Sequence, residues 1–310
     1  MTKTESNIVL FSITVCWAFS YIFIKNISNS ISAFSYLTMT SGVASIILTI
    51  VFLKKLREYN KKILFHAFIL ALILCGNSVF EKIGLATIPA SSAAFVASLN
   101  IVFVPLMMLA FKKTISLNNM VGIILILIGV IVNSGVKFGQ SLNEGFFIMT
   151  LATFCMSVYI ITVDNFAKKD DPLLLGIGQM FFTFAIAFVL WFIENPKTFF
   201  TITYTNSLLA NIFLLAFFSK AYAYIMLVYS QKYASPISVT VIASMEPVVT
   251  MVLALLIPNA FGNTEILSVE KVVGCLFILC GSIFAGTNFL NRIKSKLKER
   301  CEEGVTISKQ

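Results

Sequence analysis

The stretch SVTVIASMEPVVTMVLALL, residues 238–256, is apolar except near its middle, where Glu246 and Pro247 stand side by side. An apolar run of about twenty residues can cross the hydrocarbon core of a membrane as a helix. A carboxylate inside such a run is costly and usually functional, and a proline removes a backbone donor and interrupts the helix. The stretch therefore predicts a membrane-spanning helix with a polar break near mid-membrane.

The same apolar character extends along the whole chain. Of its 310 residues, 58% are hydrophobic and only 12% are charged, whereas soluble proteins carry about twice that charge. Because a spanning helix satisfies its own backbone hydrogen bonds in lipid, the sequence predicts an all-α polytopic membrane protein. We expect ten transmembrane helices, at residues 8–25, 31–53, 63–86, 88–111, 117–136, 144–164, 172–193, 207–231, 236–257 and 269–290.

The basic residues indicate how the chain crosses the membrane. With a cytoplasmic N-terminus, most of the 23 Lys and Arg residues fall on inner segments, above all in KKLREYNKK (54–62) and in the tail after residue 291. Lys and Arg concentrate in cytoplasmic loops, so we expect both termini in the cytoplasm. This bias accounts for the net charge of +9 without a nucleic-acid partner, and the basic tail is placed to touch anionic lipid headgroups or to remain solvated.

An internal repeat divides the chain. The segment GLATIPASSAAFVASLN (84–100) aligns without gaps with SQKYASPISVTVIASME (230–246), which pairs Asn100 with Glu246. Further on, MVGIILILIGV (120–130) matches VVGCLFILCGS (272–282), and both keep two glycines on one helix face, where a neighbouring helix can approach closely. The predicted domains are a first repeat (1–140), a second repeat (141–291) and a basic cytoplasmic tail (292–310).

The number of helices in each repeat decides how the two halves are oriented. Five is odd, so the second half enters the membrane in the opposite sense to the first. Inverted repeats with a binding site at their interface are a recurrent design of secondary transporters.

The repeated segments, extended to 84–105 and 221–249, resemble the two repeats of EamA-type transporters in the drug/metabolite transporter superfamily. The stretches CWAFSYIFIKN (16–26) and GQMFFTFAIAFVLWFIENP (178–196) fit the same pattern, so the resemblance covers nearly the whole chain. It implies two inverted five-helix halves around a central cavity. It also implies export of small metabolites or toxic compounds across the cytoplasmic membrane of a bacterium.

The expected function is therefore a secondary transporter that exports a small organic solute by alternating access, with protons as the coupling ion. Two alternatives stay open. An uptake or facilitative permease has the same architecture, and a lipid scramblase or flippase would use a polar groove open to the bilayer.

Polar residues inside the spans are the candidates for the site. At 1.5 Å per residue, Glu246, Lys220 and Asn100 all come out near the bilayer midplane. The hypothesis is that Glu246 and Lys220 line the translocation site, either paired or exchanging partners with substrate and proton. A buried ion pair with a structural role fits the same residues. Pro247 and Pro105 are the predicted helix breaks.

Several further side chains could bind a ligand or simply pack between helices. Glu81 and Lys82 lie near the outer end of the third predicted helix. The other candidates are Trp17, Tyr21, Tyr159, Gln179 and Tyr224.

The sequence offers little for catalysis or metal binding. The six cysteines are scattered without a CxxC motif, and His66 is the only histidine. Buried cysteines commonly act as small hydrophobic residues. No enzyme activity, cofactor or metal is expected.

Overall fold

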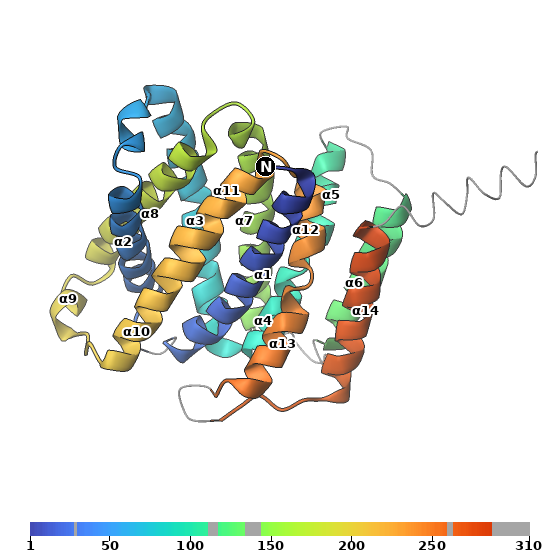
Figure 1. Cartoon of the computed structure of the whole chain (residues 1–310). Helices are drawn as coiled ribbons and strands as arrows, with labels where there is room; N and C mark the ends of the chain where they lie inside the picture. Colours follow the sequence, from blue (N-terminus) through green and yellow to red (C-terminus); the bar gives the residue numbers. More distant parts are fainter. Residues whose placement is uncertain (28–29, 111–116, 134–143, 259–262, 287–310) are drawn as a thin grey trace, which may run out of the picture.

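The computed structural model describes residues 1–27, 30–110, 117–133, 144–258 and 263–286, and every regular element among them is a helix. Long helices run side by side through the molecule (Figure 1). The first part of the chain forms α1 (Lys3–Asn26), α2 (Ala33–Val51), η1 (Lys55–Glu58), α3 (Lys61–Thr87), α4 (Ala90–Ala97), α5 (Asn100–Ala110) and α6 (Leu117–Asn133). The second part forms α7 (Glu144–Ala167), α8 (Pro172–Glu194), α9 (Thr198–Thr201), α10 (Asn206–Leu214), η2 (Leu215–Tyr224), α11 (Ile225–Gln231), α12 (Pro236–Ala243), α13 (Glu246–Leu256) and α14 (Val269–Gly286).

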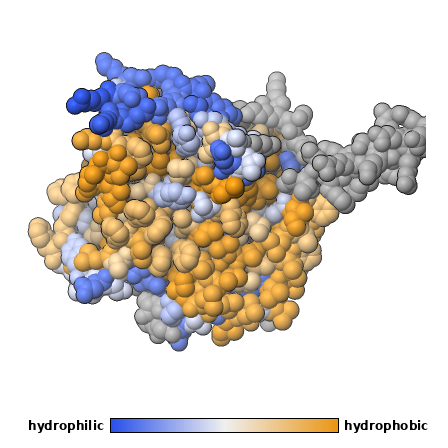
Figure 2. Space-filling model, viewed as in Figure 1, coloured by the Kyte–Doolittle hydropathy of each residue, from blue (hydrophilic) through white to orange (hydrophobic). Residues whose placement is uncertain are grey.

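The outer surface of the bundle is apolar. Figure 2 shows hydrophobic residues across the middle of one face and hydrophilic residues gathered at its upper end. Within the described ranges, eight helical stretches are long and apolar enough to cross a membrane. The other two predicted spans correspond to α6, a shorter apolar helix, and to α14. A soluble protein does not expose so much apolar surface, so the chain is a multi-pass membrane protein, as predicted.

Side-chain caps define several helix starts. Thr2 and Glu5 form a reciprocal capping box at the start of α1. The side chain of Asn60 accepts a hydrogen bond from the amide of Ile63 at the start of α3, and Asp171 caps α8 just before Pro172. These caps satisfy amide groups that have no partner within the helix. Polar residues in the turns thus mark where the apolar helices begin.

Two of the predicted spans are interrupted helices. Run 88–111 is divided into α4 and α5, and run 236–257 into α12 and α13. In both, a segment of 8 residues is followed by one of 11 residues, and Asn100 and Glu246 each begin the second segment. Pro247 lies in the first turn of α13 beside the break. Pro105, predicted as a break, instead lies inside α5. The interruption comes earlier, at Ser98 and Leu99 between α4 and α5.

A third span changes its winding without stopping. The run predicted at 207–231 consists of α10, the π-helical segment η2 and α11, which follow one another directly. Long π-helical segments are rare, and π-bulges often occur at functional sites. Here η2 contains Ser219, Lys220 and Tyr224, all of which are buried.

The predicted glycine faces bring α6 and α14 together. A Cβ atom at Gly122 would lie 2.6 Å from the carbonyl oxygen of Gly281, and one at Gly129 would lie 2.7 Å from that of Gly274. The order of these contacts means that the two helices pack in antiparallel directions. Only glycine permits so close an approach of the two backbones.

Candidate functional site

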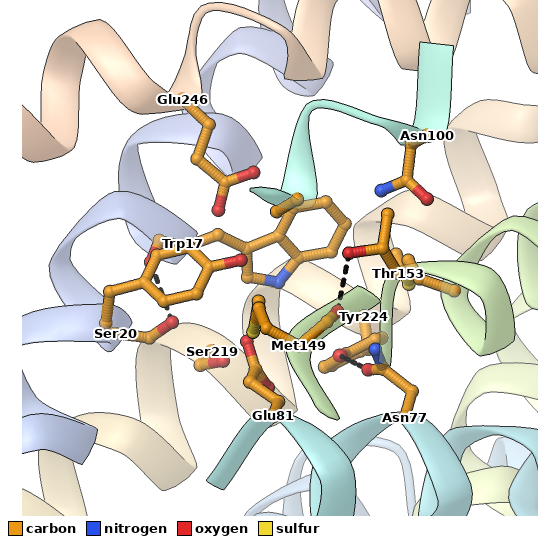
Figure 3. A pocket seen from close by; sticks show the side chains of 13 residues that line it. Trp17, Ser20, Asn77, Glu81, Asn100, Met149, Thr153, Ser219, Tyr224 and Glu246 are labelled. Carbon is orange, nitrogen blue, oxygen red and sulfur yellow. Dashed lines mark hydrogen bonds between the residues drawn. The ribbon is translucent and has the colours of Figure 1, made fainter. Parts of the chain in front are cut away.

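A polar pocket lies inside the bundle where the interrupted helices meet α1, α3, α7 and η2 (Figure 3). The space open to the centre of a water-sized sphere is about 30 Å³, which is room for one or two water molecules. The lining residues are Trp17, Ser20, Tyr21, Asn77, Glu81, Ala97, Asn100, Met149, Thr153, Met156, Ser219, Tyr224 and Glu246.

Two carboxylates face this pocket from different helices. Glu246 begins α13 and is only 6% exposed, whereas Glu81 comes from α3 and is half-buried. They are close enough to repel each other electrostatically. None of the ion pairs formed within the described part of the chain includes either residue. The two carboxyl groups of the pocket can therefore carry protons or, when ionised, balance the charge of a bound cation.

Aromatic side chains form another part of the wall. The Trp17 ring lies 5.6 Å from that of Tyr224, measured between centroids. The Trp17 Nε1–H group is buried and has no acceptor among the described residues. A buried donor without a partner costs about 1–3 kcal/mol, so this group is available to a ligand or a water molecule. Tyr21 lies near Glu246 and interacts with its carboxyl group.

The two amides of the pocket are held in place by neighbouring helices. Asn77 donates from Nδ2 to the carbonyl oxygen of Ala152 (3.0 Å) and accepts from the Tyr224 hydroxyl at Oδ1 (3.2 Å). Asn100 accepts from the Ser157 hydroxyl at Oδ1 (2.7 Å). These bonds link α3 and α5 to α7, and η2 to α3, and so fix the shape of the site.

Lys220 lies behind the wall of the pocket and is not among its lining residues. Its Nζ donates to the Ser78 hydroxyl at 2.9 Å and lies 4.9 Å from the centre of the Tyr224 ring. The carboxylate that interacts electrostatically with it is Glu81. The structure therefore does not join Lys220 to Glu246.

The remaining candidates occupy a second layer. Tyr159 donates from its hydroxyl to Oε1 of Gln179 at 2.8 Å, and both residues are fully buried. Tyr159 also packs edge-to-face on Tyr224, with ring centroids 5.9 Å apart. Neither Tyr159 nor Gln179 lines the pocket. Tyr159 supports the pocket wall by packing against Tyr224.

The polar face of α3 was only partly predicted. Asn77 and Glu81 both reach the pocket from α3, and Ser78 holds Lys220. Their spacing of three and four residues places them on one helix face, which is a signal in the sequence for a polar face in an apolar span. The neighbouring Lys82 points elsewhere, donating to the carbonyl oxygen of Ile27 at 2.9 Å.

Polar contacts tie the two halves of the chain together at the end of the bundle where the N-terminus lies. Asp170 accepts from Lys62 at 2.8 Å and lies 2.6 Å from Nδ1 of His66, both on α3. Burial alone would raise the pKa of Asp170, but the hydrogen bonds from Lys62 and His66 outweigh it and hold that pKa below its usual value.

A second set of polar contacts lies at the opposite end of the bundle. The Glu265 carboxylate accepts from the backbone amide of Ser91 (3.2 Å), from the Ser91 hydroxyl, and from Lys271 (2.8 Å). Ser91 is in the first turn of α4, so an anion there also suits the helix dipole. Burial alone would raise the pKa of Glu265, yet these hydrogen bonds hold it below its usual value.

The fold and the pocket define a polytopic membrane protein with a small polar site at two interrupted helices. The sequence profile of the EamA-like transporter family matches residues 5–135 and 143–287. The chain belongs to this family, which confirms the resemblance found in its sequence, and it is a membrane transporter of the drug/metabolite transporter superfamily.

Comparison of structures supports the fold. One solved crystal structure matches with a TM-score of 0.71, covering 94% of this chain and 99% of its own, at 15% sequence identity. At that identity the likeness concerns the fold alone. No curated protein matches the sequence.

Proposed function

We propose that the protein is a secondary transporter that exports a small organic metabolite or toxic solute by alternating access, in exchange for protons. The observation that carries the proposal is the placement of Glu81 and Glu246 in one buried pocket without an ion-pair partner in the described ranges. Intramembrane carboxylates of this kind mark ion and substrate pathways.

The two halves of the chain act as inverted repeats in this proposal, each with five membrane-spanning helices. The equal segment lengths of α4–α5 and α12–α13 support a duplication. The antiparallel packing of α6 against α14 supports the inversion, and these two helices complete ten spans. The distribution of Lys and Arg then favours cytoplasmic termini in a bacterial cytoplasmic membrane.

Alternating access requires that the two ends open in turn. The Asp170 contacts link α3 to the segment between α7 and α8, and the Glu265 contacts link α4 to the segment before α14. Both sets join the first half to the second, so each can serve as a gate. With both closed, the pocket has room only for a group of about the size of a water molecule.

Proton exchange follows from the shared pocket. A cation and a proton compensate the same negative charge, so binding of one favours release of the other. Glu246 has the central role here because it lies at a helix break and near Tyr21, with the Trp17 ring beside it in Figure 3.

A thermal-shift screen of the purified protein tests the proposal, with amino acids, nucleosides, polyamines and cationic drugs as ligands. A ligand at a hundred times its Kd stabilises a folded protein by about 2.7 kcal/mol. We expect one class to raise the Tm of the wild type and of Glu144→Gln, an exposed carboxylate on α7, but not of Glu246→Gln. The same solute should then show counterflow in proteoliposomes. Equal ligand responses in a folded Glu246→Gln variant would contradict the proposed site.

A further inference from the structure

An apolar groove lies directly beside the polar pocket, between α1 and the α10–η2 segment. It encloses about 300 Å³, ten times the space in the pocket, and is large enough for a sizeable hydrocarbon group. Its wall is almost wholly hydrocarbon and aromatic. The lining residues are Val15, Cys16, Phe19, Ser20, Phe23, Leu214, Leu215, Phe218 and Ser219.

Two serines lie at the boundary between the polar pocket and the apolar groove. Ser20 and Ser219 line both the polar pocket and the apolar groove, and they lie next to each other near Glu81 in Figure 3. Ser20 donates its hydroxyl back to the carbonyl oxygen of Trp17 at 2.7 Å, so it presents little unsatisfied polarity. A ligand that crosses this boundary has one end among carboxylates and the other among apolar side chains.

The polar end of the site selects a compact cation. Glu81 and Glu246 supply two carboxylates, and the one lysine that interacts with them, Lys220, is held back by Ser78 and Tyr224. When both carboxyl groups are ionised, one positive charge besides that of Lys220 balances the group. Since the space is about 30 Å³, that charge must be small, and a protonated amine is close to a water molecule in size.

The apolar end is open to the surrounding hydrocarbon. Phe218 lines the groove and is 45% exposed on the outer surface of the bundle. The neighbouring Phe213 and Phe217 are exposed as well. An apolar group that passes from water into this groove gains the free energy of leaving water, whereas one that comes from lipid exchanges one apolar environment for another.

We infer that the transported solute is an amphipathic amine. Its ammonium group lies between Glu81 and Glu246, and its apolar arm passes Ser20 and Ser219 into the groove between α1 and α10–η2. This inference rests on the proposed function, which it extends by naming the substrate class and a side subsite for the arm.

Straight-chain amines from propylamine to tetradecylamine are the probes, and binding to the full chain in lipid nanodiscs is the readout. Each methylene that enters the groove should strengthen binding about fourfold until the groove is full. Cys16→Phe fills the groove, so it should abolish this gain yet keep the affinity for propylamine. Leu214→Ala enlarges the groove and should extend the gain to longer arms. Cys280→Phe, at an exposed position on α14, is the matched control and should behave as wild type.

The outcomes separate the inference from the function on which it rests. If amines bind through Glu246 but show no gain with chain length, or keep the gain in Cys16→Phe, the side subsite is wrong and the polar site stands. If no amine binds, the substrate class is wrong, and the wider solute screen decides the proposed function. Partitioning into lipid is the same for every variant, so only differences between variants count. Should Cys16→Phe fail to fold, an unchanged chain-length profile in Leu214→Ala overturns the subsite.

Discussion

At the scale of single residues, the interaction of Lys220 with Glu81 affects the charge near the pocket. Lys220 is 1% exposed and hydrogen-bonded to Ser78, and Glu81 is the carboxylate that it interacts with. Removing either charge leaves the other without its compensating partner inside the bundle, which is costly. Lys220 thus offsets one of the two negative charges that the pocket carries when both of its carboxyl groups are ionised.

A double-mutant cycle measures this interaction. Lys220→Met and Glu81→Gln should each lower the Tm, and the double variant should lose less than the sum, with a coupling of about 0.5–3 kcal/mol. The control cycle combines Lys220→Met with Glu144→Gln, which should be additive because Glu144 is exposed at the start of α7. Additive losses in the first cycle would show that Lys220 and Glu81 act independently.

Trp17 offers a test of the unpaired donor. Trp17→Phe removes the Nε1–H group that has no acceptor in the described part of the chain. The Tm should therefore stay the same or rise, while solute affinity falls about fivefold or more because a hydrogen bond to the solute is lost. Trp191→Phe is the matched control. Its Nε1–H donates to the Thr198 hydroxyl at 2.7 Å, so that substitution should lower the Tm and leave solute affinity unchanged. A Tm loss in Trp17→Phe as large as in Trp191→Phe would contradict this view of the pocket.

At the scale of helices, the interruptions in α4–α5 and α12–α13 shape the pocket, whereas the glycine contacts join α6 to α14. The breaks before Asn100 and Glu246 bring polar residues and helix ends to the pocket. The glycines of α6 and α14 hold two helices that lie outside it, at backbone contact. Packing between small residues is a main source of helix association in lipid.

Alanine substitutions distinguish a glycine in close backbone contact from a glycine with ordinary neighbours. Alanine favours an isolated helix over glycine by about 1 kcal/mol. At Gly122, however, the new methyl group would lie 2.6 Å from a backbone oxygen, so Gly122→Ala should lower the Tm. At Gly76 the nearest atom is the Cys155 sulfur at 3.6 Å, an ordinary contact, so Gly76→Ala should be neutral or stabilising. Thermal melts in detergent check both, and equal effects would refute the packing of α6 on α14.

At the scale of the whole molecule, the polar contacts of Asp170 at one end and of Glu265 at the other connect the two halves of the chain. Because the Glu265 pKa is lowered in the folded state, its contribution to stability is present above the usual glutamate pKa of about 4.3 and is lost as the pH falls through the folded value. The link between α4 and the segment before α14 is therefore expected to weaken in acid.

Melting at several pH values tests this link. Glu265→Gln should have a lower Tm than wild type at pH 7. The difference should shrink as the pH falls below about 4.3, the usual glutamate pKa, and close below the lowered pKa of the folded wild-type carboxyl group. Glu144→Gln controls for the loss of any one carboxylate. A difference between wild type and Glu265→Gln that stays constant from pH 7 to pH 3 would show that charge is not what holds this end.

Much of the architecture was predictable from the sequence because apolar runs of spanning length have few alternatives in a membrane. The alignment of Asn100 with Glu246 also predicted two equivalent positions, and both prove to be the first residues after a helix break. The partner of Lys220 was not predictable. Depth along a helix says how far a residue lies from the surface, whereas its direction depends on the packing of α3 against η2, and η2 is π-helical.

Solute-driven proton movement tests the central claim most directly. The purified protein is reconstituted into liposomes with a pH-sensitive dye inside, and the solute found in the screen is added outside. We expect a change of internal pH for wild type and for Glu144→Gln, and none for a folded Glu246→Gln variant. Solute uptake without any proton movement, or proton movement that persists in Glu246→Gln, would contradict an exchange of solute and protons at the pocket.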